Sequence, residues 1–274
     1  MLHTLSALLA AEGITLCAPI SLSDCTLLRP YLLERAGITS GTAFLFAVPY
    51  YTTKCEDPTR NISAYAVSRD YHRFFEQLFA DILPQLRTRF PKNRFVGFTD
   101  HSPLAEGEAA VRAGLGFYGC NHLFLTEAHS SFVFLGEVIT DAKIDAPARP
   151  PRACFSCGSC SRACPVGLEA ASCLSSLTQK KGELSETEEI TIRAHACAWG
   201  CDRCQESCPV TKRAKESGSI YTSIAFFNES AVPYLSTAVL SAMSDAEFEQ
   251  RAYSWRGRAV ILRNLTILEK GEGE

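Results

Sequence analysis

Cysteine is the residue whose number and spacing say most about the chemistry of this chain. Of the 13 cysteines, nine lie between Cys154 and Cys208. They form two runs, Cys-x2-Cys-x2-Cys-x3-Cys-Pro from Cys154 and Cys-x2-Cys-x3-Cys-Pro from Cys201. Three thiolates at such short spacing can wrap one [4Fe–4S] cubane, and a cysteine that precedes proline reaches a second cluster. The two runs therefore predict two [4Fe–4S] clusters.

Zinc is the alternative metal for clustered cysteines. Zinc sites favour separated Cys-x2-Cys pairs that close tetrahedrally around one ion. A triple run that ends in Cys-Pro and is followed by a second Cys-Pro run is better explained by iron–sulfur clusters. A disulfide scaffold is excluded, because such chains are short and usually carry an even number of cysteines.

The ligands of the two predicted clusters can be counted. Two cubanes need eight thiolates, and the two runs supply seven. In the crossed pattern, the first cluster takes Cys154, Cys157, Cys160 and Cys208. The second cluster takes Cys164, Cys201, Cys204 and one further cysteine. Spacing alone leaves Cys173 and Cys197 as candidates, and Cys197 stands only four residues before Cys201.

The cysteine region is preceded by a much longer segment. Two neighbouring clusters transfer electrons, and a ferredoxin-like module needs only a short stretch of chain. We therefore expect residues 1–150 to form a catalytic domain that receives the electrons. Residues 151–216 are expected to form the two-cluster module, and residues 217–274 a helical segment that packs on the core.

Composition and charge exclude several classes of protein. The chain has 274 residues, 46% hydrophobic and 21% charged, which excludes a disordered or fibrous protein. The net charge of −3 means that any contact with nucleic acid has to be local. The longest apolar run, residues 43–51, is too short to span a bilayer, and the N-terminus lacks the basic start of a signal peptide. We expect a cytoplasmic protein that is a monomer.

The helices and strands predicted around the candidate site residues indicate an α/β (α+β) fold. Hydrophobic periodicity and helix-boundary residues predict the elements. Strands are expected at residues 42–51, 94–98, 122–126 and 131–140. Helices are expected at the N-terminus, at 62–89 with a break at Pro84, from the Ser102-Pro103 start to Ala113, and at 259–270, with a linker at 141–152 and a capping box at Ser244 and Glu247.

Two motifs match known cofactor-binding signatures only in part. Gly114-x-Gly116-x-x-Gly119 matches the dinucleotide fingerprint, but it follows a predicted helix and leads into a predicted strand, the reverse of what that fingerprint requires. The expected structure is a glycine-rich helix exit or a close approach to a ligand. Asp70-x-His72 begins the signature of proteins that bind cobalamin through a histidine on cobalt, but Phe75 stands where that signature needs glycine.

Several motifs, taken in order, resemble the epoxyqueuosine reductase family, the cobalamin and iron–sulfur enzymes of queuosine-tRNA maturation. The similar stretches are 63–72 (Ser-Ala-Tyr-Ala-Val-Ser-Arg-Asp-Tyr-His), 99–106 (Thr-Asp-His-Ser-Pro-Leu-Ala-Glu), 112–121 (Arg-Ala-Gly-Leu-Gly-Phe-Tyr-Gly-Cys-Asn) and 134–141 (Phe-Leu-Gly-Glu-Val-Ile-Thr-Asp). The cysteine runs, 173–178 (Cys-Leu-Ser-Ser-Leu-Thr) and 263–265 (Arg-Asn-Leu) complete the set, so the resemblance covers about residues 43–268.

The resemblance implies a function and its cofactors. It implies reduction of epoxyqueuosine to queuosine in tRNA, with electrons passing through the two clusters to a base-off cobalamin held between the N-terminal domain and the clusters. It favours Cys173 as the eighth ligand and places Asp100 at the position of the catalytic acid. The further contacts implied for the cobalamin are Tyr65, Arg69, Tyr71, His72, His101, Gly116, Asn121, Cys173, Ser175 and Gly200. A tRNA anticodon stem-loop and an electron donor are the partners implied.

The residues by themselves also allow other interpretations. Asp100 could instead form a turn or cap a helix, and Glu106 and Glu137 are further candidate acids. Local basic segments at 149–152, 212–215 and 256–258 could contact RNA phosphates or simply be solvated.

Departures from the family pattern keep two other functions open. Cys120 replaces a lysine and Phe117 a tryptophan, Pro-Leu-Ala-Glu stands at 103–106 for Pro-Val-Leu-Glu, and Cys-Pro-Val-Thr stands at 208–211 for Cys-Pro-Trp-Asn. These changes leave the predicted cluster ligands intact. The alternatives are a reductase that acts on a small molecule with the same cofactors, and a non-catalytic electron-transfer protein.

Overall fold

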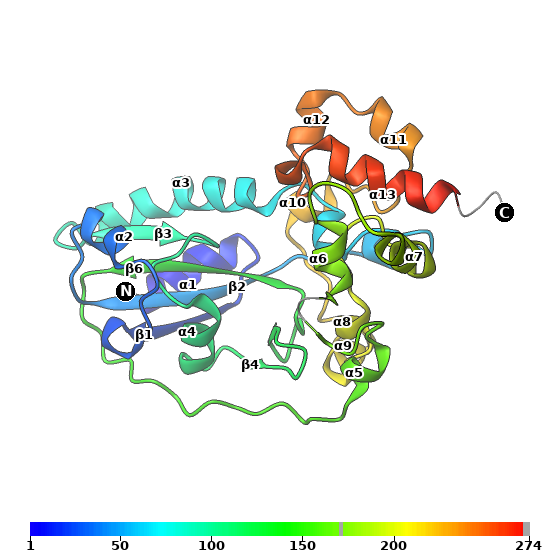
Figure 1. Cartoon of the computed structure of the whole chain (residues 1–274). Coiled ribbons are helices and arrows are strands. Elements are labelled where there is room, and N and C mark those ends of the chain that lie inside the picture. The colour runs from blue at the N-terminus through cyan, green and yellow to red at the C-terminus, as the bar shows by residue number, and fades with distance from the viewer. Residues whose placement is uncertain (170–171, 271–274) are drawn as a thin grey trace. The chain divides into compact units, whose positions relative to one another are not determined.

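A computed structural model describes residues 1–169 and 172–270. These residues form two compact units (Figure 1). Unit 1 comprises residues 1–50, 71–156 and 222–224, and unit 2 comprises residues 51–70, 157–221 and those from 225 onward. Composition suggested boundaries near residues 150 and 216, whereas the contacts group residues 51–70 with the cysteine region. The reason is backbone pairing, because Ser63 N–H donates to the Trp199 carbonyl at 2.7 Å and Ala198 N–H to the Asn61 carbonyl at 2.7 Å.

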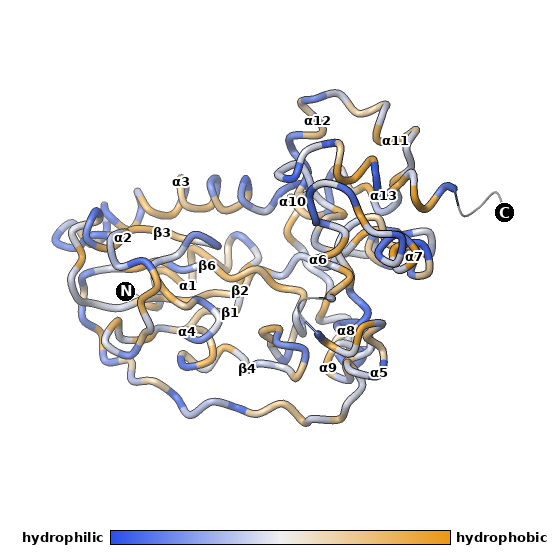
Figure 2. The backbone as a smooth tube through the Cα atoms, viewed as in Figure 1, coloured by the Kyte–Doolittle hydropathy of each residue, from blue (hydrophilic) through white to orange (hydrophobic). Residues whose placement is uncertain are grey.

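Unit 1 is built on a sheet of four antiparallel strands in the order β1-β2-β6-β3. The strands are β1 (Leu16–Ser21), β2 (Thr42–Pro49), β3 (Phe95–Phe98) and β6 (Val133–Thr140). Every residue of β2 is buried, because helices cover both faces of the sheet. Figure 2 shows hydrophobic residues along β2 and β6, as expected for the two central strands.

One face of the sheet is covered by α1 (Leu2–Ala11) and α3 (Tyr71–Arg89). Phe46 of β2 lies opposite Gly136 of β6 in the register, and its ring lies 6.1 Å from that of Phe75. A Cβ atom at Gly136 would collide with both rings. Glycine is therefore needed at this position to let the aromatic face of α3 pack against the strands.

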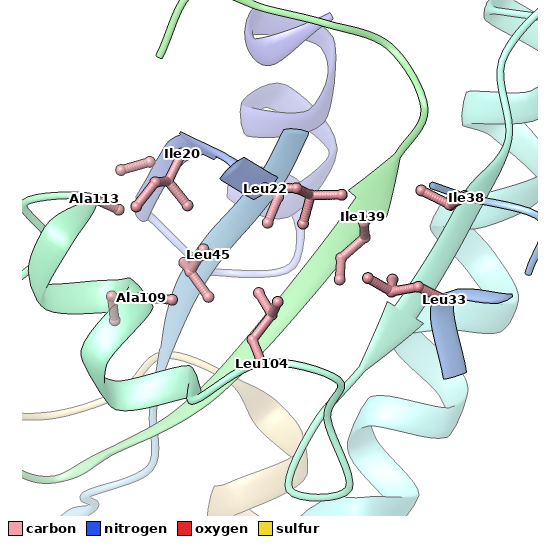
Figure 3. Close-up of a cluster of buried hydrophobic side chains, with 12 residues drawn as sticks. Ile20, Leu22, Leu33, Ile38, Leu45, Leu104, Ala109, Ala113 and Ile139 are labelled. Carbon is pink, nitrogen blue, oxygen red and sulfur yellow. The ribbon is translucent and has the colours of Figure 1, made fainter. Parts of the chain in front are cut away.

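The opposite face is covered by α4 (Glu106–Arg112). Leu45, one residue from Phe46, and Ile139, three residues from Gly136, pack here with Leu104 and Ala109 (Figure 3). A side chain alternates between faces along a strand. Glu137 lies two residues before Ile139 in β6, so its side chain is on the same face of the sheet. It faces α4 and is fully buried.

The remaining elements of unit 1 are short. They are α2 (Pro30–Arg35), β4 (Phe117–Tyr118) and β5 (Phe124–Leu125), the last two pairing as a small hairpin. Residues 141–152 hold no helix or strand, but Ala146 accepts a hydrogen bond from Ser21 N–H and Arg149 N–H donates to Arg112. The segment expected to be a linker is therefore hydrogen-bonded to unit 1.

The predicted strands at 42–51, 94–98 and 131–140 and the helices at the N-terminus and at 259–270 are confirmed. Two helix boundaries were wrong. The helix expected from residue 62 begins at Tyr71 and continues through Pro84, because Ile82 and Leu86 are buried on either side while the proline itself is exposed. The helix expected from Ser102 begins at Glu106, with Ala105 as its N-cap residue.

Strand β1 was not predicted, because Pro19 lies inside it. Proline lacks the N–H that a central strand must donate, but an edge strand tolerates it. The observed order makes β1 an edge strand, in which Pro19 lies opposite Phe44.

Unit 2 consists of short helices around a buried aromatic centre. They are α5 (Ser159–Ala163), α6 (Leu174–Thr178), α7 (Glu186–His195), α8 (Arg203–Glu206), α9 (Pro209–Glu216), α10 (Ala225–Asn228), α11 (Thr237–Ala242), α12 (Asp245–Glu249) and α13 (Arg258–Lys270). Trp199 is fully buried and packs edge-on against Tyr253, with ring centroids 6.2 Å apart. The capping box at Ser244 and Glu247 is confirmed at the start of α12. Within the described residues, no helix is long and apolar enough to cross a membrane.

Candidate active site and cofactor-binding residues

Asp100 lies in a tight turn directly after β3. Its backbone is left-handed, with φ of 59°, a conformation that aspartate adopts more readily than most residues. His101 N–H closes the turn on the Thr99 carbonyl at 2.6 Å, and Thr99 Oγ1 donates to the Leu135 carbonyl at 2.8 Å. The Asp100 side chain is 67% exposed. Because Ala105 is the N-cap residue of α4, the structure does not support Asp100 as a helix cap.

Two histidines lie beside this turn. His72, on the first turn of α3, places Nε2 3.5 Å from Asp100 Oδ2. Its ring stacks on Tyr71 with centroids 4.1 Å apart, and Tyr71 stacks in turn on Phe134 at 4.1 Å. His101 Nε2 lies 3.0 Å from the Tyr31 hydroxyl. Tyr71, His72, Asp100 and His101, all predicted from sequence, are thus brought together, whereas Tyr31 was not predicted.

Two further carboxyl groups lie behind Asp100. Glu106 Oε1 accepts the Asp100 N–H at 3.1 Å, and Ser102 Oγ donates to Glu137 Oε1. Burial, helped by the Asp100 charge, raises the pKa of Glu106 to about 7. Burial and the Glu106 charge raise the pKa of Glu137 well above its ordinary value. Both causes favour the protonated form of Glu137.

The glycine-rich segment leaves α4 as a helix exit, as the context of its motif predicted. Gly114 has a φ of +83°, and the chain then forms the β4–β5 hairpin that carries Gly116 and Asn121. Asn121 Oδ1 accepts the Leu123 N–H at 3.4 Å, so this side chain stabilises the hairpin turn. Cys120 extends from the same turn, with Sγ 3.9 Å from Cys154 Sγ.

In unit 2, a hydrogen-bonded group gathers Tyr65, Ser175 and Gly200. Trp199 Nε1 donates to the Tyr65 hydroxyl at 2.7 Å. Gly200 N–H donates to Thr178 Oγ1 at 2.9 Å, and Thr178 Oγ1 donates to the Ser175 carbonyl at 3.0 Å. Gly200 has a φ of +72°, and a Cβ there would collide with Ser63. Only glycine allows the chain to pass Ser63 in this conformation.

One buried amide supports this group and was not assigned a role from sequence. Asn264 of α13 donates to the carbonyls of Thr178 at 2.7 Å and Ala198 at 2.8 Å. It thereby connects α6 to the segment before Gly200. The only sequence feature that marked Asn264 was the Arg-Asn-Leu motif at 263–265. Arg69 lies elsewhere in unit 2, where it pairs with Glu229 at 3.2 Å and stacks on Phe226.

The chemistry of the cysteines fits cluster ligands. All 13 are thiols rather than disulfides. Cys164 Sγ accepts the Leu168 N–H at 3.2 Å, and the Ser159 hydroxyl, 3.5 Å from Cys157 Sγ, lowers the pKa of that thiol. Cys173 and Cys208 are the N-cap residues of α6 and α9. Among the residues that the structure describes, no three His, Cys, Asp or Glu side chains are arranged to hold a single metal ion.

The second cysteine run is fixed by buried charge. Asp202 lies between Cys201 and Cys204, receives hydrogen bonds from Ser63 Oγ at 2.5 Å and from Ala64 N–H at 2.6 Å, and pairs with Arg60 at 2.8 Å. A buried carboxylate needs such partners. Asp202 thus anchors the second run to residues 60–64.

Cys197 differs from Cys173 in its surroundings. Its Sγ donates to the Gly200 carbonyl at 2.7 Å and packs against the cluster of Leu174, Ile192 and Ile267. Burial raises the pKa of the Cys197 thiol to about 12, which favours its protonated form, whereas a metal ligand is a thiolate. The geometry favours a structural role for Cys197.

Comparisons with known proteins give one family. Epoxyqueuosine reductase from Gloeobacter violaceus is 33% identical over 202 residues, which are 69% of this chain and 61% of that protein. The enzyme from Bacillus subtilis is 31% identical over 210 residues, 73% of this chain and 53% of that protein. The chain thus spans between about half and three fifths of the length of these curated relatives. No family model matches.

The fold gives the same answer. The structure of epoxyqueuosine reductase from Streptococcus thermophilus superposes with a TM-score of 0.76 at 22% identity, over 99% of this chain and 81% of that one. A structure of epoxyqueuosine reductase with an epoxyqueuosine-modified tRNA-Tyr stem loop gives 0.71 at 23% identity, over 98% and 81%. The family resemblance inferred from the motifs is confirmed: in sequence and in fold, this chain is a relative of the epoxyqueuosine reductases.

Proposed function

We propose that this chain reduces epoxyqueuosine in tRNA to queuosine. In this reaction both carbon–oxygen bonds of the epoxide break, a carbon–carbon double bond forms, and the oxygen leaves as water. The balance requires two electrons and two protons. The observation that carries the proposal is Asp100, an exposed acid held in a left-handed turn beside His72, in a chain whose relatives bear this activity in their names.

Asp100 is the proposed general acid. Its carboxyl group is exposed, so it can reach an oxygen of a bound substrate, while its backbone is fixed by Glu106. A positioned acid of this kind protonates the oxygen as the carbon–oxygen bond breaks. His72 Nε2, 3.5 Å from Asp100 Oδ2, can orient that carboxyl group.

We propose two [4Fe–4S] clusters, held by Cys154, Cys157, Cys160 and Cys208 and by Cys164, Cys173, Cys201 and Cys204. The reduced thiols and the N–H donated to Cys164 support this donor set. A cluster of four irons spreads its thiolates more widely than a single ion does. The absence of a single-ion site among the described residues is thus compatible with it.

A base-off cobalamin is the second cofactor we propose. When bound, it would supply the reductive chemistry at carbon, and the clusters would supply its electrons. The candidate contacts are Tyr71, His72 and His101, which belong to unit 1, and Tyr65, Ser175 and Gly200, which belong to unit 2. His72 already lies against Asp100, which supports a role in the acid site rather than as a ligand of cobalt.

RNA binding is proposed on local basic residues. Arg152 pairs with Glu127, Lys215 with Glu56, and Arg258 donates to the carbonyls of Leu240 and Met243, so these cations are already engaged. Lys212 and Arg213 on α9 are exposed. Trp255 is 58% exposed with the Arg256 guanidinium 3.8 Å from its ring centroid, a pair suited to stacking on a nucleobase.

The decisive experiment is an anaerobic assay of cluster-loaded protein. It contains cobalamin, a chemical reductant and an epoxyqueuosine-containing anticodon stem-loop, and the nucleosides are read by mass spectrometry. We expect epoxyqueuosine to disappear as queuosine accumulates. Binding of cobalamin without turnover of this RNA would instead favour a small-molecule substrate, and failure to bind cobalamin would favour an electron carrier.

A further inference from the structure

The turn that carries Asp100 has one strong attachment to α4. The Asp100 N–H points to Glu106 Oε1 at 3.1 Å, while the Asp100 side chain remains exposed. A left-handed residue other than glycine is held only where its surroundings fix it. Glu106, the first residue of α4, therefore supplies a contact that the strained turn needs.

A second layer holds the other end of the turn. Ser102 is fully buried, its Oγ accepts the Leu104 N–H at 2.9 Å, and it donates to Glu137. Glu137 Oε2 is buried without a hydrogen-bond partner among the described residues. A neutral acid tolerates such a position far better than a carboxylate does. Glu137 therefore supports, through Ser102, the segment between Asp100 and Glu106 from inside the core.

Resting on the proposed function, we propose that Glu106 is the positioning residue of the catalytic acid. Its carboxylate holds the Asp100 turn in place, and the Ser102–Glu137 pair fixes the chain on which both depend. Glu106 takes no part in the bond-breaking itself. In a structure of epoxyqueuosine reductase from Bacillus subtilis, the loop of the catalytic aspartate is swung out of the active site, so the position of such a loop can vary in that relative.

The charge on Glu106 makes this attachment depend on pH. The groups that face it are the Asp100 carboxyl, the Arg29 guanidinium from the segment before α2, and Glu137 on β6. Cys25 in turn faces Glu137. A hydrogen bond to a charged acceptor is stronger than one to a neutral acceptor. As Glu106 loses its proton near pH 7, its hydrogen bond with the Asp100 N–H becomes stronger.

The test is hydrogen exchange of cluster-loaded protein without substrate, measured on peptides that cover residues 99–104. At pH 8, Glu106→Ala should exchange about ten- to a hundredfold faster than wild type in this segment, the range for a lost hydrogen bond to a charged group. Glu106→Gln keeps an acceptor and should lose only part of the protection. Between pH 6 and 8, protection corrected for the intrinsic rate should rise in wild type and stay constant in Glu106→Gln.

Glu108→Gln is the matched control, because Glu108 lies on the same helix but contacts Thr26 and Arg112 instead. It should leave the exchange of residues 99–104 unchanged. Unchanged exchange in Glu106→Ala, or wild-type protection that does not vary with pH, would overturn the proposal. Circular dichroism and iron content verify that each variant is folded and loaded.

Turnover separates this proposal from the function on which it rests. Glu106→Ala should lower kcat for the stem-loop about tenfold or more with little change in KM, and Glu106→Gln should recover much of that loss. If wild type converts no epoxyqueuosine, the proposed function fails, while the exchange result still decides the role of Glu106. If wild type is active and Glu106→Ala keeps its full kcat, only the positioning role fails.

Discussion

The cysteine region of unit 2 and the acid site of unit 1 are assembled in opposite ways. Between residues 157 and 208 the candidate ligands are separated by only two or three residues within each run, so local turns set their spacing, although each proposed cluster also takes ligands from outside one run. The acid site takes His72, Asp100, Glu106 and Glu137 from α3, a turn, α4 and β6. Its geometry depends on sheet register and helix packing. Loss of one cysteine ligand should therefore affect one cluster, whereas damage to the acid site should spread through the turn that carries Asp100.

The largest effect is expected when the Asp100 carboxyl group is replaced by an amide of the same shape, which cannot protonate a leaving oxygen. Asp100→Asn should lower turnover by about 10²- to 10⁴-fold, the usual contribution of a general acid, while iron content and cobalamin binding stay normal. The measurement is queuosine formation under anaerobic single-turnover conditions. Asp81→Asn, on the exposed side of α3, is the control. Near-normal turnover of Asp100→Asn would remove Asp100 from the mechanism.

In the cysteine region, the eighth cluster ligand can be identified by replacing each of its two candidates. Cys173→Ala should lose the iron of one cluster, about half of the total, because four thiolates hold each cubane. Cys197→Ala should keep all of it, because the Cys197 thiol donates to the Gly200 carbonyl and packs on apolar residues. Iron and sulfide analysis after anaerobic reconstitution measures both. Loss in Cys197→Ala with retention in Cys173→Ala would reverse the assignment.

The same contrast explains what could be predicted from the sequence. The cysteine runs and the strands at 42–51 and 131–140 were predictable, because spacing and hydrophobic runs are local signals. Glu137 was only a weak candidate, since its burial depends on the register that sets it opposite Leu45. Tyr31 gave no usable signal, because its partner His101 lies 70 residues away in the chain. Asn264 was marked only by the Arg-Asn-Leu motif, and its role depends on carbonyl groups at least 66 residues away. Pro84 misled, because burial of the neighbouring turns outweighs its local cost.

The buried acid predicts how stability depends on pH. Burial raises the pKa of Glu137 well above its ordinary value, so the folded chain keeps this proton to a higher pH than the unfolded chain, in which the group ionises with a pKa of about 4.3. The folded state thus binds more protons, and this residue lowers the free energy of unfolding by up to about 1.4 kcal/mol for each pH unit as the pH rises above that value. Glu137→Gln does not titrate, so its stability relative to wild type should increase from pH 6 to pH 8.

Thermal unfolding of cluster-loaded wild type and Glu137→Gln at a series of pH values measures this difference. Contributions from the cofactors are common to both proteins and cancel. Glu108→Gln serves as the control, since its carboxylate is partly exposed and should leave the pH dependence as in wild type. A constant difference between Glu137→Gln and wild type from pH 6 to pH 8 would show that Glu137 is ionised in the folded protein.

The smallest expected effect concerns RNA contacts at the surface, outside both the cysteine region and the acid site. Lys212 and Arg213 are exposed on α9, so the double alanine variant should weaken stem-loop binding several-fold without changing iron content. If each residue neutralises one phosphate, the slope of log affinity against log salt should fall by about one per residue. Affinity measured between low and moderate salt, with exposed Arg87→Ala on α3 as the control, decides the matter. An unchanged slope would exclude α9 from the RNA interface and direct attention to Trp255 and Arg256, where stacking rather than charge would carry the contact.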